Sequence, residues 1–351
     1  MRFERLTPGQ RPPASLIGAV LTQDLVIGGE RWSKGRRLTA ADLEAFRADP
    51  LPGIGPVTMI LVEVGDLHED DAALRLADAI GGAGLTRRGP AQSRVDLFAA
   101  QDGVLHVRVA ELEQLNRLDP LEVFTRLDGS IVAAGDLVAS VKVAPHVVEG
   151  AVVEAGVRIT HDGQRPLVRV APFRPMRVGV VVKGSLRAAA RPRFEASARL
   201  KVESLGSVVL GIDYVADEDD AVRGALERLV RGRGDTRANV VLTAGGRSTD
   251  PLDPFFNAIE RLGGRVVRHG VPAHPGSMLW LARVSRTAIL GLPTCGAYSK
   301  ATAADLLLPR LLTGEPPTRR TVSHLGHGGV LTRDMRFRFP PYARELDAPD
   351  G

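Results

Sequence analysis

One stretch of the sequence combines an apolar run, a pair of glycines and two acidic residues: VVLTAGGRSTDPLD, residues 240–253. Its first three residues are bulky and apolar, as in a strand that is buried on both faces. Gly245 and Gly246 then allow a tight turn whose backbone N–H groups stay uncovered, and such a turn can hold an anion. Aspartates beside an anion are unusual unless they bind a metal ion or handle protons, so this stretch predicts a ligand site.

A helix is expected directly after this turn. Asp253 suits the N-cap position, Pro254 suits the first helical position, and the segment FFNAIERLGG has apolar residues at helical spacing before two glycines. In open α/β sheets, ligands dock where a strand passes through a glycine turn into the N-terminus of a helix. The stretch therefore has the order of elements that such a site needs.

The composition narrows the class of protein around this site. The 351 residues are enough for two or three domains with cores of their own. Cys295 is the single cysteine, which excludes a disulfide framework; the sequence shows neither a membrane-spanning run nor a secretion signal, so we expect a cytoplasmic protein with no membrane partner. The net charge of +5 is mild and only 4% of the residues are aromatic, which argues against a nucleic-acid partner. Scattered arginines favour small anionic ligands, although an arginine bias on a solvated surface explains them equally well.

Changes in sequence pattern divide the chain into four parts. Residues 1–60 are rich in Pro and Gly and are expected to form a lead-in segment with one helix capped by Thr39. Residues 61–172 combine short strands and glycine turns with one good helix, which predicts a smaller, β-rich α+β domain. Residues 173–320 alternate strands with helices, which predicts an α/β domain with a parallel or mixed sheet in a three-layer arrangement. Residues 321–351 are rich in Arg and Pro and are expected to form a surface tail.

Three motifs in region 176–314 resemble the molybdopterin-binding domain of molybdenum cofactor biosynthesis proteins. The family pattern T-x-G-G-x-S with a following Asp is matched by TAGGRSTDPLD at 243–253, its later P-G by HPGSM at 274–278, and its G-L-P-G by GLPTCGAYSKAT at 291–302. Their order, and their places at strand ends, make this match more specific than one glycine loop. The segments HEDDAALRLADAIGGAGL and SHLGHGGVL extend the resemblance to a subgroup in which a swivelling β-rich domain precedes the molybdopterin domain.

The resemblance implies a ligand and a set of binding residues. The ligand is molybdopterin or the molybdenum cofactor, a pterin that carries a dithiolene and a terminal phosphate. Backbone and hydroxyl donors at the turn would hold the phosphate, because an anion gains most from donors concentrated at a turn or a helix N-terminus. The expected binding residues are Thr243, Gly245, Gly246, Ser248, Asp250, Pro275, Gly276, Ser277, Gly291, Pro293, Ser299, Lys183, Gly184 and Ser185.

Two aspartates are the expected catalytic groups. Asp253 lies beside the phosphate and is the candidate ligand for Mg²⁺, which prefers hard oxygen ligands. Asp217, in YVADEDD, matches a carboxylate that the family brings to the same pocket from a neighbouring strand. Two carboxylates and a metal ion suit phosphoryl or nucleotidyl transfer. The alternative is structural, since both aspartates stand where a helix is expected to start; we expect a dual function for Asp253 and leave Asp217 open.

Departures from the family pattern argue against strong catalysis. At the end of the first strand the family has T-G-[ND]-E or a similar turn, whereas this chain reads KGSL at 183–186 and lacks the acidic residue. Thr294 stands where G-L-P-G has its last glycine, and its side chain hinders close approach to the backbone. Gly276 is explained almost equally well by a plain turn.

Two classes of function therefore stay open. The first is a molybdopterin- or molybdenum cofactor-binding protein that acts in cofactor biosynthesis, delivery or insertion into a molybdenum enzyme, with a molybdenum hydroxylase apo-enzyme as candidate partner. The alternative is an active molybdopterin molybdenumtransferase or adenylyltransferase. A third interpretation is an α/β domain that binds ATP without pterin. The departures favour the first class, and the resemblance also suggests a homo-oligomer.

Overall fold

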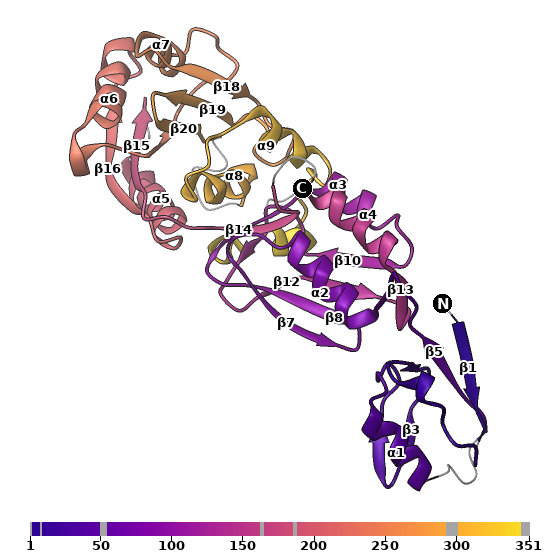
Figure 1. The fold of residues 1–351 in the computed structure, drawn as a ribbon. Helices are drawn as coiled ribbons and strands as arrows, with labels where there is room; N and C mark the ends of the chain where they lie inside the picture. Colours follow the sequence, from indigo (N-terminus) through magenta and orange to yellow (C-terminus); the bar gives the residue numbers. More distant parts are fainter. Residues whose placement is uncertain are drawn as a thin grey trace. The chain divides into compact units, whose positions relative to one another are not determined.

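The structure, a computed structural model, describes residues 2–7, 9–49, 55–161, 165–184, 188–292 and 301–344. The chain divides into two compact units (Figure 1). The first unit comprises Met1–Gln101, Leu105–Asp128 and Val132–Val170, and the second comprises Asp102–Val104, Gly129–Ile131 and Ala171–Gly351. No described helix is both long enough and apolar enough to span a membrane.

The first part of unit 1 is a small β-structure with a buried cluster. Its elements are β1 (Arg2–Leu6), η1 (Ala14–Leu16), β2 (Val20–Leu21), β3 (Leu25–Ile27), β4 (Glu30–Trp32), α1 (Ala40–Ala48) and β5 (Val57–Leu61). The strands pair antiparallel in the order β1-β5-β2, with β3 and β4 as a separate hairpin. Thr39 caps α1 in a reciprocal capping box with Asp42. Leu16, Trp32 and Phe46 are buried in the cluster, so the segment expected as a lead-in has packed apolar residues of its own.

Residues 66–172, most of which belong to unit 1, pack helices on small β-sheets. Its elements are β6 (Asp66–His68), α2 (Glu69–Ile80), β7 (Leu85–Ala91), β8 (Arg94–Ala99), β9 (Gly103–Val107), α3 (Val109–Leu115), β10 (Leu121–Thr125), β11 (Ile131–Val132), β12 (Leu137–Val143), β13 (Val147–Glu149), α4 (Gly150–His161) and β14 (Val168–Pro172). The sheet orders are β10-β12-β8-β7, β11-β9-β14 and β13-β6. Ala73, Leu76 and Ile80 recur at helical spacing on α2 and bury one face of this helix.

Unit 2 is built on a six-stranded sheet in the order β16-β15-β17-β20-β19-β18. The strands are β15 (Arg177–Lys183), β16 (Val208–Val215), β17 (Val240–Ala244), β18 (Arg265–His269), β19 (Trp280–Val284) and β20 (Thr287–Gly291). Strands β16, β15, β17 and β20 are parallel, whereas β19 and β18 continue the sheet antiparallel. The α/β class with a mixed sheet, expected from the sequence, is confirmed.

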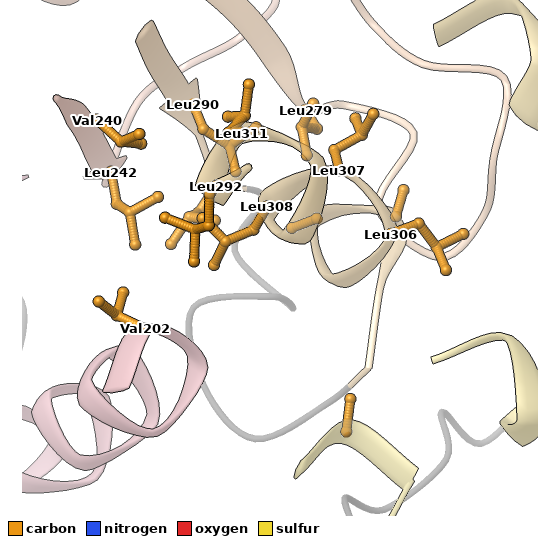
Figure 2. Packing of buried hydrophobic residues seen from close by; sticks show 14 of the residues in the cluster. Val202, Val240, Leu242, Leu279, Leu290, Leu292, Leu306, Leu307, Leu308 and Leu311 are labelled. Atoms are coloured by element: carbon orange, nitrogen blue, oxygen red, sulfur yellow. The ribbon is translucent and has the colours of Figure 1, made fainter. Parts of the chain in front are cut away.

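Helices cover both faces of this sheet (Figure 1). They are α5 (Arg191–Glu203), α6 (Asp219–Arg231), α7 (Pro254–Arg261) and α8 (Ala303–Leu312), and the short 3-10 turns η2 (Ala188–Ala190) and η3 (Gly234–Thr236) lie in the connections. Because neighbouring strand residues point to opposite faces, Leu242 joins the cluster of α5 and α8, while Val241 joins the cluster of α6 and α7. In Figure 2, Leu242 and Leu308 lie together, and Val202 of α5 faces Leu242. The result is a three-layer domain with a core on each face of the sheet.

The segment after residue 320, expected as a surface tail, contributes to one of these cores. Its elements are α9 (Arg319–Ser323), η5 (His324–Gly326), η6 (Arg333–Arg338) and α10 (Pro341–Arg344). Val322, Leu325, Leu331, Phe339 and Tyr342 are buried in the cluster that contains α5 and α8. These residues are irregularly spaced among polar residues, Gly and Pro, so no strand or helix periodicity reveals their burial in the sequence.

Candidate functional site

The carboxyl ends of three neighbouring parallel strands bring polar residues together. Strand β15 ends at Lys183, which pairs with Val215 at the end of β16, and Val182 pairs with Ala244 at the end of β17. Asp217 follows β16, and the glycine turn follows β17. Because parallel strands end at the same edge of the sheet, residues far apart in the chain meet here, at the place where open α/β sheets bind ligands.

The ammonium group of Lys183 bridges the two predicted catalytic aspartates. Its Nζ atom lies 2.6 Å from Oδ1 of Asp217 and 2.8 Å from Oδ2 of Asp253. The side chains of Lys183 and Asp253 are buried, with exposed fractions of 0% and 1%, whereas Asp217 keeps 38% of its side chain exposed. A buried ammonium is costly unless it is paired, and the two carboxylates provide that pairing. Lys183 was predicted as an anion contact; in the structure its charge is directed at the aspartates.

Asp253 closes the turn as well as capping the helix. Its Oδ1 accepts a hydrogen bond from the backbone N–H of Phe255 (2.9 Å), which makes it the N-cap of α7. Its Oδ2 accepts one from the N–H of Arg247 (2.7 Å) in addition to the Lys183 contact. Asp217 is different, because the N-cap of α6 is Glu218. The capping alternative therefore holds for Asp253 and fails for Asp217.

The two glycines of the turn differ in what requires them. Gly245 has a φ of +82°, and a Cβ at this position would lie 2.2 Å from the backbone oxygen of Lys183, so glycine is needed for packing against β15. A Cβ at Gly246 would meet its nearest atom, on the Phe255 ring, at 3.3 Å. Within the described part of the chain, the N–H groups of Gly246 and Ser248 have no hydrogen-bond acceptor. The turn thus offers backbone donors to an anion.

Arg247 is a site residue that the sequence analysis did not single out. Its guanidinium lies 3.6 Å from Oδ2 of Asp217 and 3.7 Å from Oδ2 of Asp250, and 60% of its side chain is exposed. The other oxygen of Asp250 accepts the N–H of Leu252 at 3.0 Å, so this carboxylate also shapes the loop. A guanidinium beside uncovered N–H groups is well suited to a phosphate. Its position inside G-G-R-S was the available signal.

Other predicted residues make backbone and packing contacts at the strand ends next to the turn. Thr243 is buried in β17, pairs with Gly291 of β20, and accepts the N–H of Leu292 at 2.8 Å. A Cβ at Gly291 would lie 2.0 Å from the indole ring of Trp280, so this glycine makes room for the ring. The N–H of Gly184 donates to the carbonyl of Val215 at 3.0 Å. These residues position the strand ends.

The predicted P-G segment is tied to the start of α8. The carbonyl of Pro275 accepts the N–H of Ala303 at 2.9 Å. Gly276 has a φ of +106°, and a Cβ there would lie 2.9 Å from the backbone nitrogen of Ala303. The carbonyl of Ser277 accepts the N–H of Val271 at 2.9 Å. These contacts meet the requirements of a turn packed on a helix N-terminus.

Not all predicted residues gather around the bridging ammonium. No hydrogen bond or ion pair within the described ranges joins the segment 275–277 to Lys183, Asp217 or Asp253. The predicted residues Ser185, Pro293 and Ser299 lie outside the described residues, as do Thr294 and Cys295.

The expected magnesium site does not fit this geometry. Mg²⁺ requires near-octahedral oxygen ligands at about 2.0–2.1 Å. The inner oxygens of Asp217 and Asp253 instead contact Lys183, and both oxygens of Asp253 already accept backbone N–H groups. A divalent cation held by both carboxylates would lie against the ammonium group. The residues present therefore provide an internal cation where a metal ion was expected.

Comparisons with known proteins relate this site to a family. The domain is first of all an α/β domain with a polar turn at the carboxyl edge of its sheet. Residues 196–313 match the family model described as a probable molybdopterin binding domain, so the resemblance found in the motifs is confirmed for this part of the chain. The match includes Asp217, the turn and Gly291, and begins after Lys183.

Solved structures include similar proteins at low sequence identity. The molybdopterin biosynthesis enzyme MoaB from Thermus thermophilus is 20% identical, with a TM-score of 0.29, and the similarity covers 40% of this chain and 98% of that chain. The molybdopterin biosynthesis MoeA protein from Pyrococcus horikosii is 13% identical, with a TM-score of 0.29, and covers 74% of this chain and 81% of that chain. No curated protein matches the sequence.

Proposed function

We propose that this protein binds molybdopterin, or the molybdenum cofactor made from it, and acts in the biosynthesis, delivery or insertion of that cofactor. The observation that carries the proposal is the position of the turn within the segment that matches the molybdopterin-binding family. That turn lies at the carboxyl edge of the parallel strands and combines uncovered N–H groups with the exposed guanidinium of Arg247. The terminal phosphate of the pterin is the group that these donors recognise.

The charges around the turn support an anionic ligand. A phosphate bound at the turn would be repelled by Asp217 and Asp253 if these carboxylates were unpaired. Lys183 contacts both of them, and Arg247 faces the outer oxygen of Asp217 as well as Asp250, so two positive charges offset much of the negative charge of the three aspartates. These ion pairs lower the repulsion that a phosphate would meet from Asp217 and Asp253.

A transferase is the second candidate function, as a molybdopterin molybdenumtransferase or adenylyltransferase. One observation favours it: Asp217 and Asp253 meet at the same ammonium group, as a pair of catalytic carboxylates would be brought together. Both oxygens of Asp253 are occupied by backbone N–H groups, however, which favours the binding function. In delivery, the partner would be a molybdenum hydroxylase apo-enzyme, and the protein would act as a homo-oligomer.

A binding measurement tests the proposal. Purified protein is incubated with molybdopterin, and the bound pterin is quantified by fluorescence after oxidation. Arg247→Ala is compared with Arg228→Ala, whose guanidinium is 65% exposed and pairs with Asp213 at 3.2 Å on the edge strand β16. We expect about a tenfold or larger loss of affinity for Arg247→Ala, because a hydrogen bond to a charged group contributes about 1.5–3 kcal/mol, and no loss for Arg228→Ala. Equal affinities in all three proteins would rule out the turn as the phosphate site.

The same protein separates the two candidate functions. It is incubated with molybdopterin, ATP and Mg²⁺, and the products are analysed by mass. The binding function predicts unchanged pterin. An adenylylated or metal-loaded product would favour the transferase.

A further inference from the structure

We infer that the ammonium group of Lys183 is a built-in substitute for a divalent metal ion between Asp217 and Asp253, so that this site handles its ligand without a metal. The inference deepens the proposed function and rests on it where it concerns the ligand. Its part concerning the metal rests only on the geometry of these three side chains.

The distances support direct substitution. Nζ of Lys183 contacts one oxygen of Asp217 at 2.6 Å and one of Asp253 at 2.8 Å. These are the inner oxygens that a shared metal ion would need. Two carboxylates that share a site repel each other unless a positive charge lies between them. In this chain the lysine supplies that charge.

The local charge count is also that of a metal site. Lys183 and Arg247 provide two positive charges beside the negative charges of Asp217, Asp253 and Asp250. One Mg²⁺ would provide the same charge. The covalently attached cation differs in one respect, because it stays at the site whatever the metal concentration.

The position of the cluster distinguishes it from an ordinary structural ion pair. Asp217 is 38% exposed and Arg247 is 60% exposed, so partly exposed charged side chains lie next to the buried ammonium. The ion pairs of Arg247 measure 3.6 and 3.7 Å, which is longer than the about 2.7–2.9 Å of a charge-assisted hydrogen bond. The guanidinium thus has N–H groups to direct at an anion that enters beside it.

The test uses metal ions alone as the probe. Thermal unfolding of the full chain is measured with EDTA, Mg²⁺ or Mn²⁺, and Mn²⁺ binding is followed by electron paramagnetic resonance. We expect no metal response from the wild type. Lys183→Ala should have a lower midpoint in EDTA that rises with either metal, because a ligand that binds only the folded state stabilises it.

Two controls separate a vacated metal site from a general loss of buried charge. Lys183→Arg keeps a cation between the aspartates and should show no metal response. Lys201→Ala also removes a buried lysine, but it leaves the single carboxylate of Asp305 and should not respond either. If Lys183→Ala is insoluble without metal, Lys183→Gln replaces it in the same measurements.

Two results would contradict the substitution of a metal ion by Lys183. Mn²⁺ binding by the wild type at this pair, removed by Asp217→Asn, would overturn it. So would a folded Lys183→Ala or Lys183→Gln protein that ignores both metals. Wild-type pterin binding that is equal in EDTA and in Mg²⁺ is the further expected result. Absence of any pterin binding would contradict the proposed function, while the metal measurements would still decide the substitution.

Discussion

Two buried lysines in unit 2 form ion pairs that differ in how far their carboxylate partners are exposed to solvent. Lys183, at the end of β15, pairs with Asp253, which is buried, and with Asp217, which is partly exposed. Lys201, on α5, forms an ion pair with Asp305, and their side chains are 2% and 0% exposed. Asp305 also accepts a hydrogen bond from the hydroxyl of Tyr342 at 3.0 Å. The first cluster opens at the edge of the sheet, whereas the second is closed by the packing of α5, α8 and α10.

The same type of ion pair, a buried lysine with aspartate, has different surroundings in the two clusters. The Lys201 cluster ties three segments together: α5 through the lysine, the start of α8 through the capping box of Thr302 with Asp305, and α10 through Tyr342. The charges of Lys201 and Asp305 are both paired within the protein and are buried. The Lys183 cluster has the exposed Arg247 at its outer side, so part of its charge faces solvent. The two ion pairs therefore differ in their exposure to solvent, and the proposed function rests on the exposed one.

The largest expected effect comes from breaking the closed cluster. Asp305→Ala removes the partner of Lys201, the acidic half of the capping box of α8 and the acceptor of Tyr342. We expect a loss of about 3–5 kcal/mol in the free energy of unfolding, because a buried charge is left uncompensated. Urea unfolding followed by circular dichroism measures it. A loss below that of Asp217→Ala, whose carboxylate is partly exposed, would contradict the comparison.

The second prediction compares the two glycines of the turn. Gly245→Ala forces a Cβ to within 2.2 Å of the backbone oxygen of Lys183 at a positive φ, and we expect a loss of about 3 kcal/mol. Gly246→Ala meets only the Phe255 ring at 3.3 Å and is expected to cost less than about 1 kcal/mol. Thermal unfolding of the two variants checks this order. Equal losses would mean that the turn does not pack on β15 as described.

The third prediction concerns the hydroxyl of Tyr342. Tyr342→Phe removes a hydrogen bond to a charged acceptor and is expected to cost about 2 kcal/mol near neutral pH. Burial and the neighbouring Asp305 carboxylate raise the pKa of Tyr342 well above its usual value. A raised folded-state pKa stabilises the protein fully below the unfolded pKa of about 10, and this contribution is lost as the pH rises beyond it.

The alkaline limb of the unfolding profile measures this contribution. The wild type should lose stability as the pH rises above about 10 more steeply than Tyr342→Phe. Tyr214, whose pKa burial and the carboxylate of Glu195 raise to about 12, is present in both proteins and contributes equally to both profiles. Parallel profiles for the two proteins would show that Tyr342 ionises as freely in the folded state as in the unfolded state.

The parts of this comparison that could be predicted from sequence are the local ones. The apolar run, the paired glycines and the Asp-Pro helix start of residues 240–253 define a strand, a turn and a cap within one short segment. The family match supports the molybdopterin-binding assignment of the region around them. Backbone preferences and capping act over a few residues, so a strand, turn or cap can be predicted without knowledge of the tertiary structure.

The contacts that give the site its character depend on the register between distant segments. Lys183 meets Asp217 and Asp253 only because β15, β16 and β17 end at the same edge of the sheet. Lys201 meets Asp305 across two helices that are far apart in the sequence. A lysine at a strand end is explained equally well as an anion contact or as an internal cation until its carboxylates are located. The sequence alone therefore could not show that Lys183 pairs with Asp217 and Asp253, and its contact with an anion stays a prediction.

The smallest expected change in stability, and the sharpest test of the open cluster, is Asp217→Asn. The carboxylate is 38% exposed, and Lys183 keeps Asp253, so the loss should be at most about 1 kcal/mol, as for a partly solvated ion pair. Removing one negative charge near the turn should raise the affinity for the phosphorylated pterin by about fivefold, which corresponds to about 1 kcal/mol of relieved repulsion. Under the transferase alternative the same substitution would remove a catalytic carboxylate and abolish turnover. Pterin fluorescence titrations and product analysis on the same samples decide between the two; weaker pterin binding by a stably folded Asp217→Asn protein would show that this carboxylate contacts the ligand rather than only holding Lys183.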